Sequence, residues 1–214
     1  MMRWKKISDA VVRRLPLYLR VLEEAHQSGE TKLMSSHELG ERAGVSPALV
    51  RKDLAWFGEF GKQGVGYEVG YLREELRKIL NLDREIRIGL IGVGSLGHAL
   101  VRYNQQRYAE DSHFNLHIVA LFDNDPSKVH RQLDGMLIHP IDALAEVTKQ
   151  ERLQMAIVTV PAAAAQQVAD RCVEAGIRAI LNFAPAKLVV PAGVYLANAD
   201  VSLEMQRLAY YLGE

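Results

Sequence analysis

The feature that most constrains the fold of this chain is a glycine-rich turn between an apolar strand and a helix. The stretch "IRIGLIGVGSLGHAL", residues 86–100, contains the pattern G-x-G-x-x-G. In this pattern the first glycine permits a tight turn, the second lets backbone N–H groups approach a pyrophosphate, and the third lets the helix close on the strand. The phosphates then lie at the positive end of the helix. We therefore expect a dinucleotide to bind at Gly92, Val93, Gly94, Ser95, Leu96 and Gly97.

The sequence around this turn alternates between apolar and helical segments. Strand-like stretches such as "IRIGLIG", "HIVALFD", "MAIVTV" and "RAILNF" are separated by segments with helical periodicity. Such alternation is typical of a parallel sheet that helices cover on both faces. We expect a doubly wound Rossmann domain of the α/β class at residues 83–199, with its sheet finished by about residue 183.

An acidic residue ends the second strand of this domain. Asp123, in "LFDND", lies 26 residues after Gly97, and the long segment "YNQQRYAEDSHFN" accounts for this wide spacing. A carboxylate at this position accepts hydrogen bonds from the adenosine ribose and disfavours a 2′-phosphate. Asp123 therefore predicts NAD⁺ or NADH as the cofactor rather than the phosphorylated forms. The alternative is a doubly wound domain that binds no nucleotide.

The N-terminal part contains a helix-turn-helix pattern, in "SSHELGERAGVSPALVRKDLAWFG". Ser35 and a glutamate three residues later form a capping box that begins a short helix, and Gly44 ends it. Ser46 then caps a second helix with Pro47 at its first position, and Gly58 is expected to end that helix. Two short helices joined by a tight, glycine-containing turn predict a helix-turn-helix.

The second of these helices has one apolar and one polar face. Val50, Leu54 and Phe57 recur at helical spacing and predict a buried stripe. Arg51 and Lys52 face the other way, between alanines. Small residues beside two cations allow a helix to enter a major groove while the long side chains reach bases and phosphates. The alternative is a solvated helix face with an ordinary Arg-Lys pair.

The stretch "GEFGKQGVGYEV" follows this helix and predicts a tight β-hairpin, the wing of a winged helix. Lys62 in its glycine-rich tip can approach phosphates or the minor groove. A plain connecting loop is the alternative. The predicted DNA-binding residues are Ser46, Pro47, Arg51, Lys52, Lys62, Gly64 and Tyr67.

The charge is divided unevenly along the chain. Residues 1–82 contain 14 Lys and Arg against 11 Asp and Glu, a net charge of +3, whereas residues 83–214 contain 12 against 15, a net charge of −3. This fits a winged-helix DNA-binding domain at residues 1–82 joined to an acidic domain. The single cysteine, Cys172, excludes an intramolecular disulfide, and no run of about 18 apolar residues predicts a membrane span. We expect a soluble, cytoplasmic protein.

No set of residues predicts catalysis. The seven histidines show no metal-ligand spacing, and the strand ends "TVPAAAAQ" and "LNFAPA" lack acids and bases. A dehydrogenase needs a positioned acid or base beside the nicotinamide and a pocket for its substrate. We therefore expect no catalytic residue and no metal, and a cofactor that is sensed rather than consumed. The alternative is an NAD-dependent oxidoreductase whose substrate site lies in the short C-terminal tail.

Over essentially its whole length the chain resembles the Rex family of redox-sensing bacterial transcriptional repressors. The matching stretches are "RLPLYLRVLE", "VRKDLAWFGEFGKQGVGYEV", "GLIGVGSLGHAL", "ALFDNDPSKV", "TVPAAAAQ" and "ILNFAPA", in this order and at normal intervals. One departure is Ser95, where the family often has asparagine, and it bears on a phosphate contact rather than on the identity of the cofactor. The resemblance implies a repressor that binds operator DNA when NAD⁺ prevails and releases it when NADH accumulates.

The resemblance also implies a homodimer. In the family the C-terminal helix crosses to the partner subunit and packs between its two domains, which here assigns domain-swapped dimerisation to residues 200–214. This segment has an apolar face that a small monomer could not easily bury. The alternative is a helix folded back on its own domain. The apolar residues are Val201, Met205, Leu208 and Leu212.

By resemblance, three residues form the switch. Asp200 pairs with Arg14 in the DNA-bound form and turns to Tyr103 when NADH enters. Plainer interpretations are a surface cation at Arg14, a packing aromatic at Tyr103 and the N-cap of the last helix at Asp200. The residues assigned to the cofactor site beside the glycine turn and Asp123 are Tyr103, Pro161, Asn182, Phe183 and Asp200.

Overall fold

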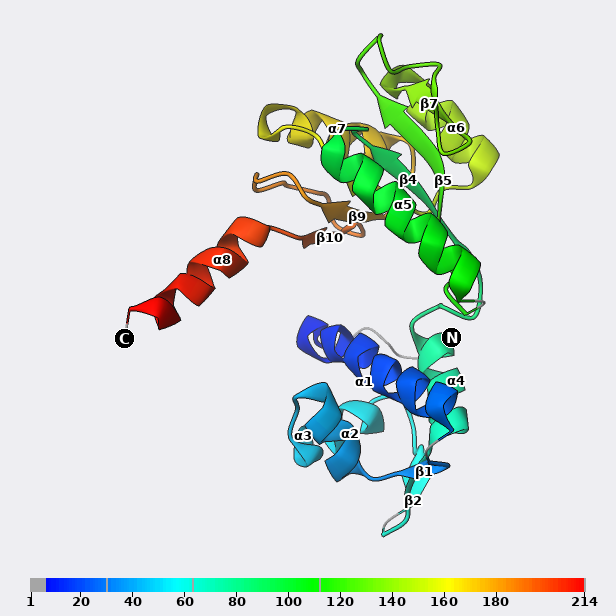
Figure 1. Ribbon diagram of the computed structural model, residues 1–214, viewed down its shortest axis with the longest axis vertical. Helices are drawn as coiled ribbons and strands as arrows, with labels where there is room; N and C mark the ends of the chain where they lie inside the picture. The colour runs from blue at the N-terminus through cyan, green and yellow to red at the C-terminus, as the bar shows by residue number, and fades with distance from the viewer. Residues whose placement is uncertain (1–6, 30, 63, 112, 214) are drawn as a thin grey trace. The chain divides into compact units, whose positions relative to one another are not determined.

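The computed structural model describes residues 7–29, 31–62, 64–111 and 113–213. The chain divides into two compact units, Met1–Arg84 and Glu85–Glu214, close to the boundary expected between residues 82 and 83 (Figure 1). The first unit contains helices α1 (Asp9–Ser28), α2 (Ser36–Ala43), α3 (Pro47–Ala55) and α4 (Val69–Ile79) and strands β1 (Leu33–Met34), β2 (Gly61–Lys62) and β3 (Gly66–Glu68).

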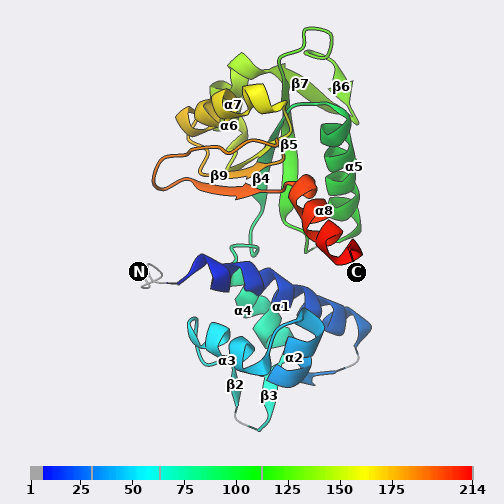
Figure 2. The same cartoon turned by 90° about the vertical axis from the view of Figure 1, so that its left-hand side faces the viewer.

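The helices of the first unit enclose one core. Helix α1 packs mainly on α4 and α2, and α2 packs on α3 (Figure 2). One face of α1 is buried because apolar residues recur at helical spacing, and Leu15 and Leu22 are at most 1 % exposed. They join a single cluster with Leu39 of α2, Val50 of α3 and Leu72 of α4.

Both helices of the helix-turn-helix begin where the capping residues predict. The side-chain oxygen of Ser35 accepts a hydrogen bond from the Glu38 N–H, and that of Ser46 accepts one from the Leu49 N–H. Gly44 ends α2 in the left-handed conformation. Helix α3 ends at Ala55, so the expected end at Gly58 is wrong. The N–H groups of the next two residues donate to carbonyls three residues earlier, which tightens the chain into a turn.

The predicted wing is a β-hairpin. Strands β2 and β3 pair in antiparallel fashion, with Gly61 opposite Tyr67 and Lys62 opposite Gly66. The short β1 pairs with the other edge of β3, so that the sheet order is β1-β3-β2. The hairpin therefore follows the second helix of the helix-turn-helix, as a winged helix requires.

The second unit is a seven-stranded sheet with helices on both faces. The strand order is β10-β9-β8-β4-β5-β7-β6, and among the residues described in this unit only β6 and β7 pair in antiparallel fashion. The strands are β4 (Ile86–Ile91), β5 (Leu116–Asp123), β6 (Gln132–Leu133), β7 (Met136–Pro140), β8 (Met155–Val158), β9 (Ala179–Asn182) and β10 (Tyr195–Asn198). The helices are α5 (Ser95–Glu110), α6 (Leu144–Glu151), α7 (Ala162–Glu174) and α8 (Val201–Ala209), with 3₁₀ turns at Ile141–Ala143 and Tyr210–Leu212.

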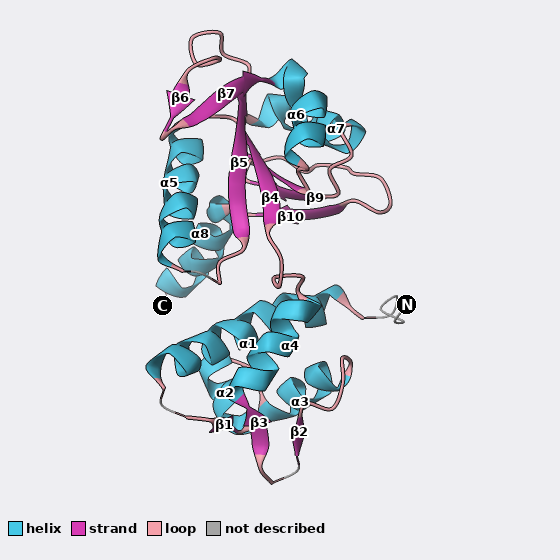
Figure 3. Ribbon diagram, turned by 90° about the vertical axis from the view of Figure 1, so that its right-hand side faces the viewer, coloured by secondary structure: helices cyan, strands magenta, loops and turns pink. Residues whose placement is uncertain are grey.

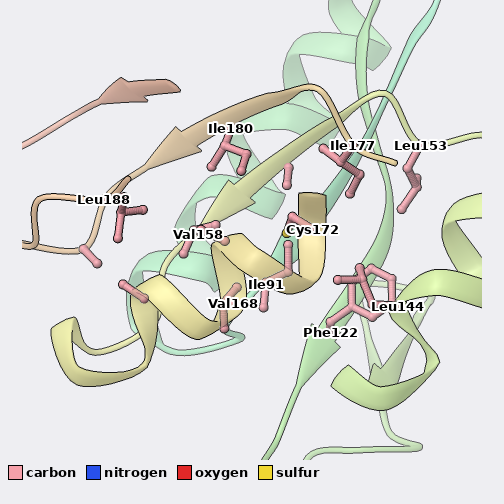
Figure 4. Packing of buried hydrophobic residues seen from close by; sticks show 14 of the residues in the cluster. Ile91, Phe122, Leu144, Leu153, Val158, Val168, Cys172, Ile177, Ile180 and Leu188 are labelled. Carbon is pink, nitrogen blue, oxygen red and sulfur yellow. The ribbon is translucent and has the colours of Figure 1, made fainter. Parts of the chain in front are cut away.

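Helix α5 lies on one face of the sheet and helices α6 and α7 lie on the other (Figure 3), and each face has its own hydrophobic cluster. On one face α5 covers β4 and β5, where Val101 packs with Leu90 and Ile118. On the other face α6 and α7 enclose a second cluster, in which Cys172 lies among Ile91, Phe122 and Ile180 and is fully buried (Figure 4). Burial raises the pKa of the Cys172 thiol to about 12, so that the thiol stays protonated at neutral pH.

Two features of the sheet differ from the expectation. The sheet does not finish by residue 183, because Tyr195–Asn198 adds β10 in parallel register with β9. Residues 132–140 form the β6–β7 hairpin, which periodicity did not predict. Both stretches are too short to carry a clear alternation of apolar and polar residues. With β10 included, the strands β7, β5, β4, β8, β9 and β10 follow the Rossmann order 3-2-1-4-5-6.

Helix α8 follows β10 directly (Figure 1). Its described residues are all exposed, with Met205 at 60 % and Leu208 at 55 %. Within the described residues, no helix is long and apolar enough to cross a membrane.

Candidate cofactor and DNA-binding sites

The glycine turn joins β4 to α5 and packs against the end of β8, where the strand order reverses. Gly92 has a φ of 101°, and a Cβ there would lie 2.7 Å from the carbonyl oxygen of Thr159. A Cβ at Gly97 would overlap the carbonyl oxygen of Gly92. The Thr159 hydroxyl donates to the carbonyl oxygens of Ile91 and Gly92, at 3.1 and 2.7 Å. Packing within the chain therefore requires the first and third glycines. Thr159, which no sequence signal predicted, stabilises the turn.

The second glycine faces open space instead. Gly94 has an extended backbone, with φ −92° and ψ −168°, and a Cβ there would meet no atom within 4 Å. It is the N-cap of α5 but offers no side chain to the free N–H groups of the first turn. Ser95 and Leu96, the first two residues of that turn, are exposed. This arrangement fits a bound pyrophosphate, because the N–H groups and the positive end of a 16-residue helix meet where a Cβ would otherwise lie.

Asp123 ends β5 beside this turn and is 6 % exposed. Its Oδ2 accepts a hydrogen bond from the Val93 N–H at 2.8 Å and lies 3.2 Å from Lys128 Nζ. Its Oδ1 accepts one from the Asp125 N–H at 2.9 Å. Burial raises the pKa of Asp123, but the hydrogen bonds from Asp125, Val93 and Lys128 outweigh it and hold the pKa below its usual range. The carboxylate is thus ionised at neutral pH and orients the glycine turn.

A pocket of about 300 Å³ adjoins Asp123. No local sequence pattern predicts this pocket, because its lining comes from two separate segments at the ends of β5 and β7. Its position beyond the carboxyl end of a parallel strand is where α/β sheets bind ligands. The lining residues are Asp123, Asn124, Pro126, Val129, His130, Pro140, Ile141 and Asp142.

The other predicted cofactor residues have diverse surroundings. Pro161 is exposed at the N-cap of α7, and Tyr103 of α5 is 59 % exposed. Phe183 is half-buried and packs on the cluster beneath α5. Asn182 is buried, and its amide group donates to the carbonyl oxygens of Ala184 and Ala186 and to the Asn198 side chain. Asn182 therefore fixes the loop after β9 and the end of β10.

Asp200 caps the last helix. Its Oδ1 accepts a hydrogen bond from the Ser202 N–H at 2.9 Å. Asp200 is half-exposed, so that this cap leaves part of the carboxylate open. The cap confirms the plainer interpretation of Asp200, which is compatible with a further role in the switch.

The polar face of α3 is open to solvent. Arg51 and Lys52 are exposed, whereas Val50 and Leu54 on the other face are 0 % and 2 % exposed. A groove of about 720 Å³ lies between α3 and the wing, and Arg51, Lys62 and Gly64 are among its lining residues. Cations line a concave surface of this kind where a protein meets a nucleic-acid backbone.

The remaining predicted DNA contacts are less exposed or already engaged. Ser46 uses its hydroxyl to cap α3, and Pro47 forms the first turn. Tyr67 is 8 % exposed and packs in the core, although it contributes to the groove lining. The structure adds Ser36 at the start of α2, whose hydroxyl accepts a hydrogen bond from Arg51 Nη1 at 2.8 Å. No sequence signal pointed to Ser36, because 15 residues separate it from Arg51.

Arg14 is not a free surface cation. Its Nε and Nη2 donate to the two carboxylate oxygens of Asp53, at 2.5 and 2.8 Å, and the Tyr18 hydroxyl donates to Asp53 Oδ2 at 2.7 Å. Burial raises the pKa of Asp53, but the bonds from Arg14 and Tyr18 hold it below its usual range. The same contact raises the pKa of Arg14. Asp53 was missed, although an acid on the buried face of an amphipathic helix is a signal for a buried cation partner.

In the parts of the chain that the structure describes, no group of three or more histidine, cysteine, aspartate or glutamate residues could hold a metal ion. The two units match separate family models. Residues 6–55 match "Putative DNA-binding protein N-terminus", and residues 83–186 match "CoA binding domain".

Curated relatives span the whole chain. The chain is 48 % identical over 212 residues to the redox-sensing transcriptional repressor Rex of Brevibacillus brevis, covering 99 % of this chain and 100 % of that protein. It is 42 % identical to the protein of the same name from Desulfitobacterium hafniense, covering 99 % and 98 % of the two chains.

Three solved structures of one protein, RSP, also match nearly the whole chain. The crystal structure of RSP in complex with beta-NAD⁺ and operator DNA superposes with a TM-score of 0.86 at 36 % identity, covering 96 % of this chain and 92 % of that one. The crystal structure of RSP in complex with beta-NADH superposes with a TM-score of 0.82 at 33 % identity, covering 97 % and 94 %. A further structure of RSP, described as a Rex-family repressor, superposes with a TM-score of 0.84 at 35 % identity, covering 97 % and 95 %.

Proposed function

This chain belongs to the Rex family of redox-sensing transcriptional repressors, and from this premise we propose which of its residues read DNA and which sense the cofactor. The chain is a DNA-binding repressor and not an enzyme, and it responds to NAD⁺ and NADH. One observation supports these roles most directly. A single chain contains both a winged helix and a glycine turn that has open space at Gly94 for a dinucleotide.

We assign cofactor binding to the second unit. The N–H groups of the first turn of α5 bind the pyrophosphate beside Gly94, and the pocket next to Asp123 holds the adenosine end. Asp123 keeps the glycine turn in place through the Val93 N–H and disfavours a 2′-phosphate. The bound cofactor supplies a nicotinamide that changes by one charge and in ring planarity between its oxidised and reduced forms. The residues assigned to that end are Tyr103, Pro161, Asn182, Phe183 and Asp200.

We assign DNA reading to the first unit. Helix α3 enters the major groove with Arg51 and Lys52 directed at bases and phosphates, because these are its exposed cations. The wing places Lys62 and Gly64 beside the same groove, where they contact the backbone or the minor groove. Ser46 and Pro47 support this surface by fixing the start of α3.

The functional protein is a homodimer in which residues 200–214 pack on the second subunit. The exposed apolar side chains of α8 support this proposal, since a single chain leaves Val201, Met205, Leu208 and Leu212 at least 55 % exposed. A two-fold symmetric pair of winged helices would then read a palindromic operator.

Arg14, Tyr103 and Asp200 form the switch in this proposal. NAD⁺ and NADH shift a conformational equilibrium only if the two forms interact differently with its two states. The half-exposed carboxylate of Asp200 pairs with Arg14 in the DNA-bound state and with Tyr103 when NADH is bound. The 59 % exposed Tyr103 side chain supports this, because it is free to meet a carboxylate from outside its own helix.

A cofactor titration tests the assignment of Asp123. NADH is titrated into the purified chain and its fluorescence is followed. We expect a dissociation constant of about 1 μM or lower, which corresponds to a binding free energy of about −8 kcal/mol or more favourable. NADPH is expected to bind far more weakly. Equal affinities for the two would remove the role given to Asp123.

A further inference from the structure

The cluster of Arg14, Tyr18 and Asp53 joins the first helix to the DNA-reading helix. Asp53 immediately follows Lys52 on α3, but its side chain is only 1 % exposed. Its two carboxylate oxygens accept three hydrogen bonds from α1. Arg14 donates one to each oxygen, and the Tyr18 hydroxyl donates the third to Oδ2. Arg14 and Tyr18 are four residues apart and thus lie one above the other on α1.

This contact links two helices that otherwise share only α2 as a main packing partner. Helix α1 packs mainly on α4 and α2, and α3 packs mainly on α2. A two-point bond between a guanidinium and a carboxylate fixes orientation as well as distance. Together with the buried Val50 and Leu54, it therefore fixes the rotation of α3 about its axis, so that Asp53 faces inward while Arg51 and Lys52 face outward.

The pair also restricts how Arg14 can respond to a second carboxylate. Arg14 uses Nε and Nη2 for Asp53, and within the described residues its Nη1 donates no hydrogen bond. Its side chain is 22 % exposed. A second carboxylate can thus approach Arg14 from solvent. Any displacement of the guanidinium is transmitted to Asp53, because the Asp53 side chain is only 1 % exposed and solvent cannot replace bonds that it loses.

We propose that Asp53 is the positioning residue that couples Arg14 to the DNA-reading helix. Arg14 is held by Asp53 in every state. When Asp200, which the second subunit contributes, pairs with Arg14 or separates from it, the position of α3 changes through the Arg14–Asp53 pair. Asp53 itself does not touch DNA, because it is buried. This inference rests on the proposed role of Arg14 in the switch and extends it to a residue that joins the switch to the reading surface.

The test uses the full-length protein and a labelled operator. Operator affinity is measured at fixed salt with saturating NAD⁺ and with saturating NADH, and the ratio of the two affinities is the readout. Asp53→Asn keeps the shape of the side chain but removes its charge, and we expect the ratio to fall by about fivefold or more. Because Asp53 lies in the first unit, NADH is still expected to bind.

A matched control separates positioning from general loss of stability. Glu23→Gln makes the same chemical change in another ion pair of the first unit, between α1 and α4, where Arg77 Nη1 lies 3.1 Å from Glu23 Oε1. Glu23→Gln is expected to keep the wild-type ratio. Tyr18→Phe removes one hydrogen-bond donor from Asp53 and should also lower the ratio of the two operator affinities. This variant tests the role of Asp53 if Asp53→Asn does not fold.

The outcomes distinguish this inference from the proposed function. A folded Asp53→Asn protein with the wild-type ratio, or an equal fall in the ratio of Glu23→Gln, overturns the role of Asp53 alone. If Asp53→Asn does not fold, an unchanged ratio in Tyr18→Phe overturns that role. A wild-type protein whose operator affinity is the same with NAD⁺ and NADH overturns the proposed function and this inference together.

Discussion

Arg14 of α1 and Asp53 of α3 form a two-point ion pair across 39 residues of sequence, with the carboxylate buried and the guanidinium partly exposed. A buried carboxylate is tolerated only when it is paired and hydrogen-bonded. The pair is therefore a fixed element of the winged helix. It also places the arginine assigned to the redox switch in direct contact with the helix assigned to DNA reading.

Acid should weaken the first unit through this pair. The folded state holds the pKa of Asp53 below its ordinary value, so the ion pair stabilises the fold at pH values above the unfolded pKa of about 3.9. This stability is lost as the pH falls through the lower, folded pKa. Both tryptophans lie in the first 84 residues, so tryptophan fluorescence reports unfolding of this unit in urea. Asp53→Asn is expected to flatten the decline in the free energy of unfolding below pH 4, and an equally steep decline would contradict this assignment.

The exposed cations of α3 should carry operator affinity. Arg51→Ala and Lys52→Ala are each expected to weaken operator binding by about 1–3 kcal/mol at fixed salt, because each loses contacts with bases or phosphates. Lys149→Ala removes an exposed cation from α6 in the second unit and is the matched control, expected to bind as the wild type does. A footprint unchanged by either α3 substitution would show that this helix does not read DNA.

A side chain at Gly94 should lower the affinity for the cofactor without lowering the stability of the fold. Gly94→Val fills the open space beside the first turn of α5, where its extended backbone accepts a side chain without strain. NADH affinity is expected to fall at least about tenfold, or about 1.4 kcal/mol, while thermal unfolding stays near that of the wild type. Gly70→Ala, in α4, is the control with wild-type NADH affinity. Undiminished NADH binding by Gly94→Val would place the pyrophosphate elsewhere.

The last helix should decide the oligomeric state. Leu208→Asp puts a charge on the apolar face of α8 and is expected to convert the dimer to a monomer, because an unpaired carboxylate is costly in an apolar interface. Gln206→Asp makes a similar change on another face of the same helix and should leave the dimer intact. Light scattering after size-exclusion chromatography gives the masses. A monomeric wild type, or a dimer that Leu208→Asp leaves unaffected, would exclude α8 as the dimer contact.

Local signals in the sequence predicted much of the fold. The caps at Ser35 and Ser46 begin the two helices because each needs only a neighbouring N–H. The contact of Gly97 with the Gly92 carbonyl oxygen is a short-range constraint of the same kind, whereas Gly92 itself packs against Thr159, 67 residues away. Strand β10 was missed because its four residues have no periodicity of their own, and its place depends on parallel pairing with β9.

What the sequence did not predict about the candidate sites is which distant residues contact one another. Asp53 meets Arg14 across 39 residues, and Asp123 holds the Val93 N–H across 30. The position of Asp53 on the buried face of its helix signals a cation partner, but no local pattern identifies which distant residue that partner is. The roles of Tyr103, Pro161 and Asp200 stay predictions, because they concern contacts with a cofactor and a second subunit.

A mobility shift on the promoter upstream of the chain's own gene, with NAD⁺ and NADH titrated against each other at constant total cofactor and fixed salt, decides whether this repressor senses redox state. We predict that the purified protein retains the DNA when NAD⁺ predominates and releases it as the share of NADH rises. Equal occupancy of the operator at every ratio of NADH to NAD⁺ would contradict the switch.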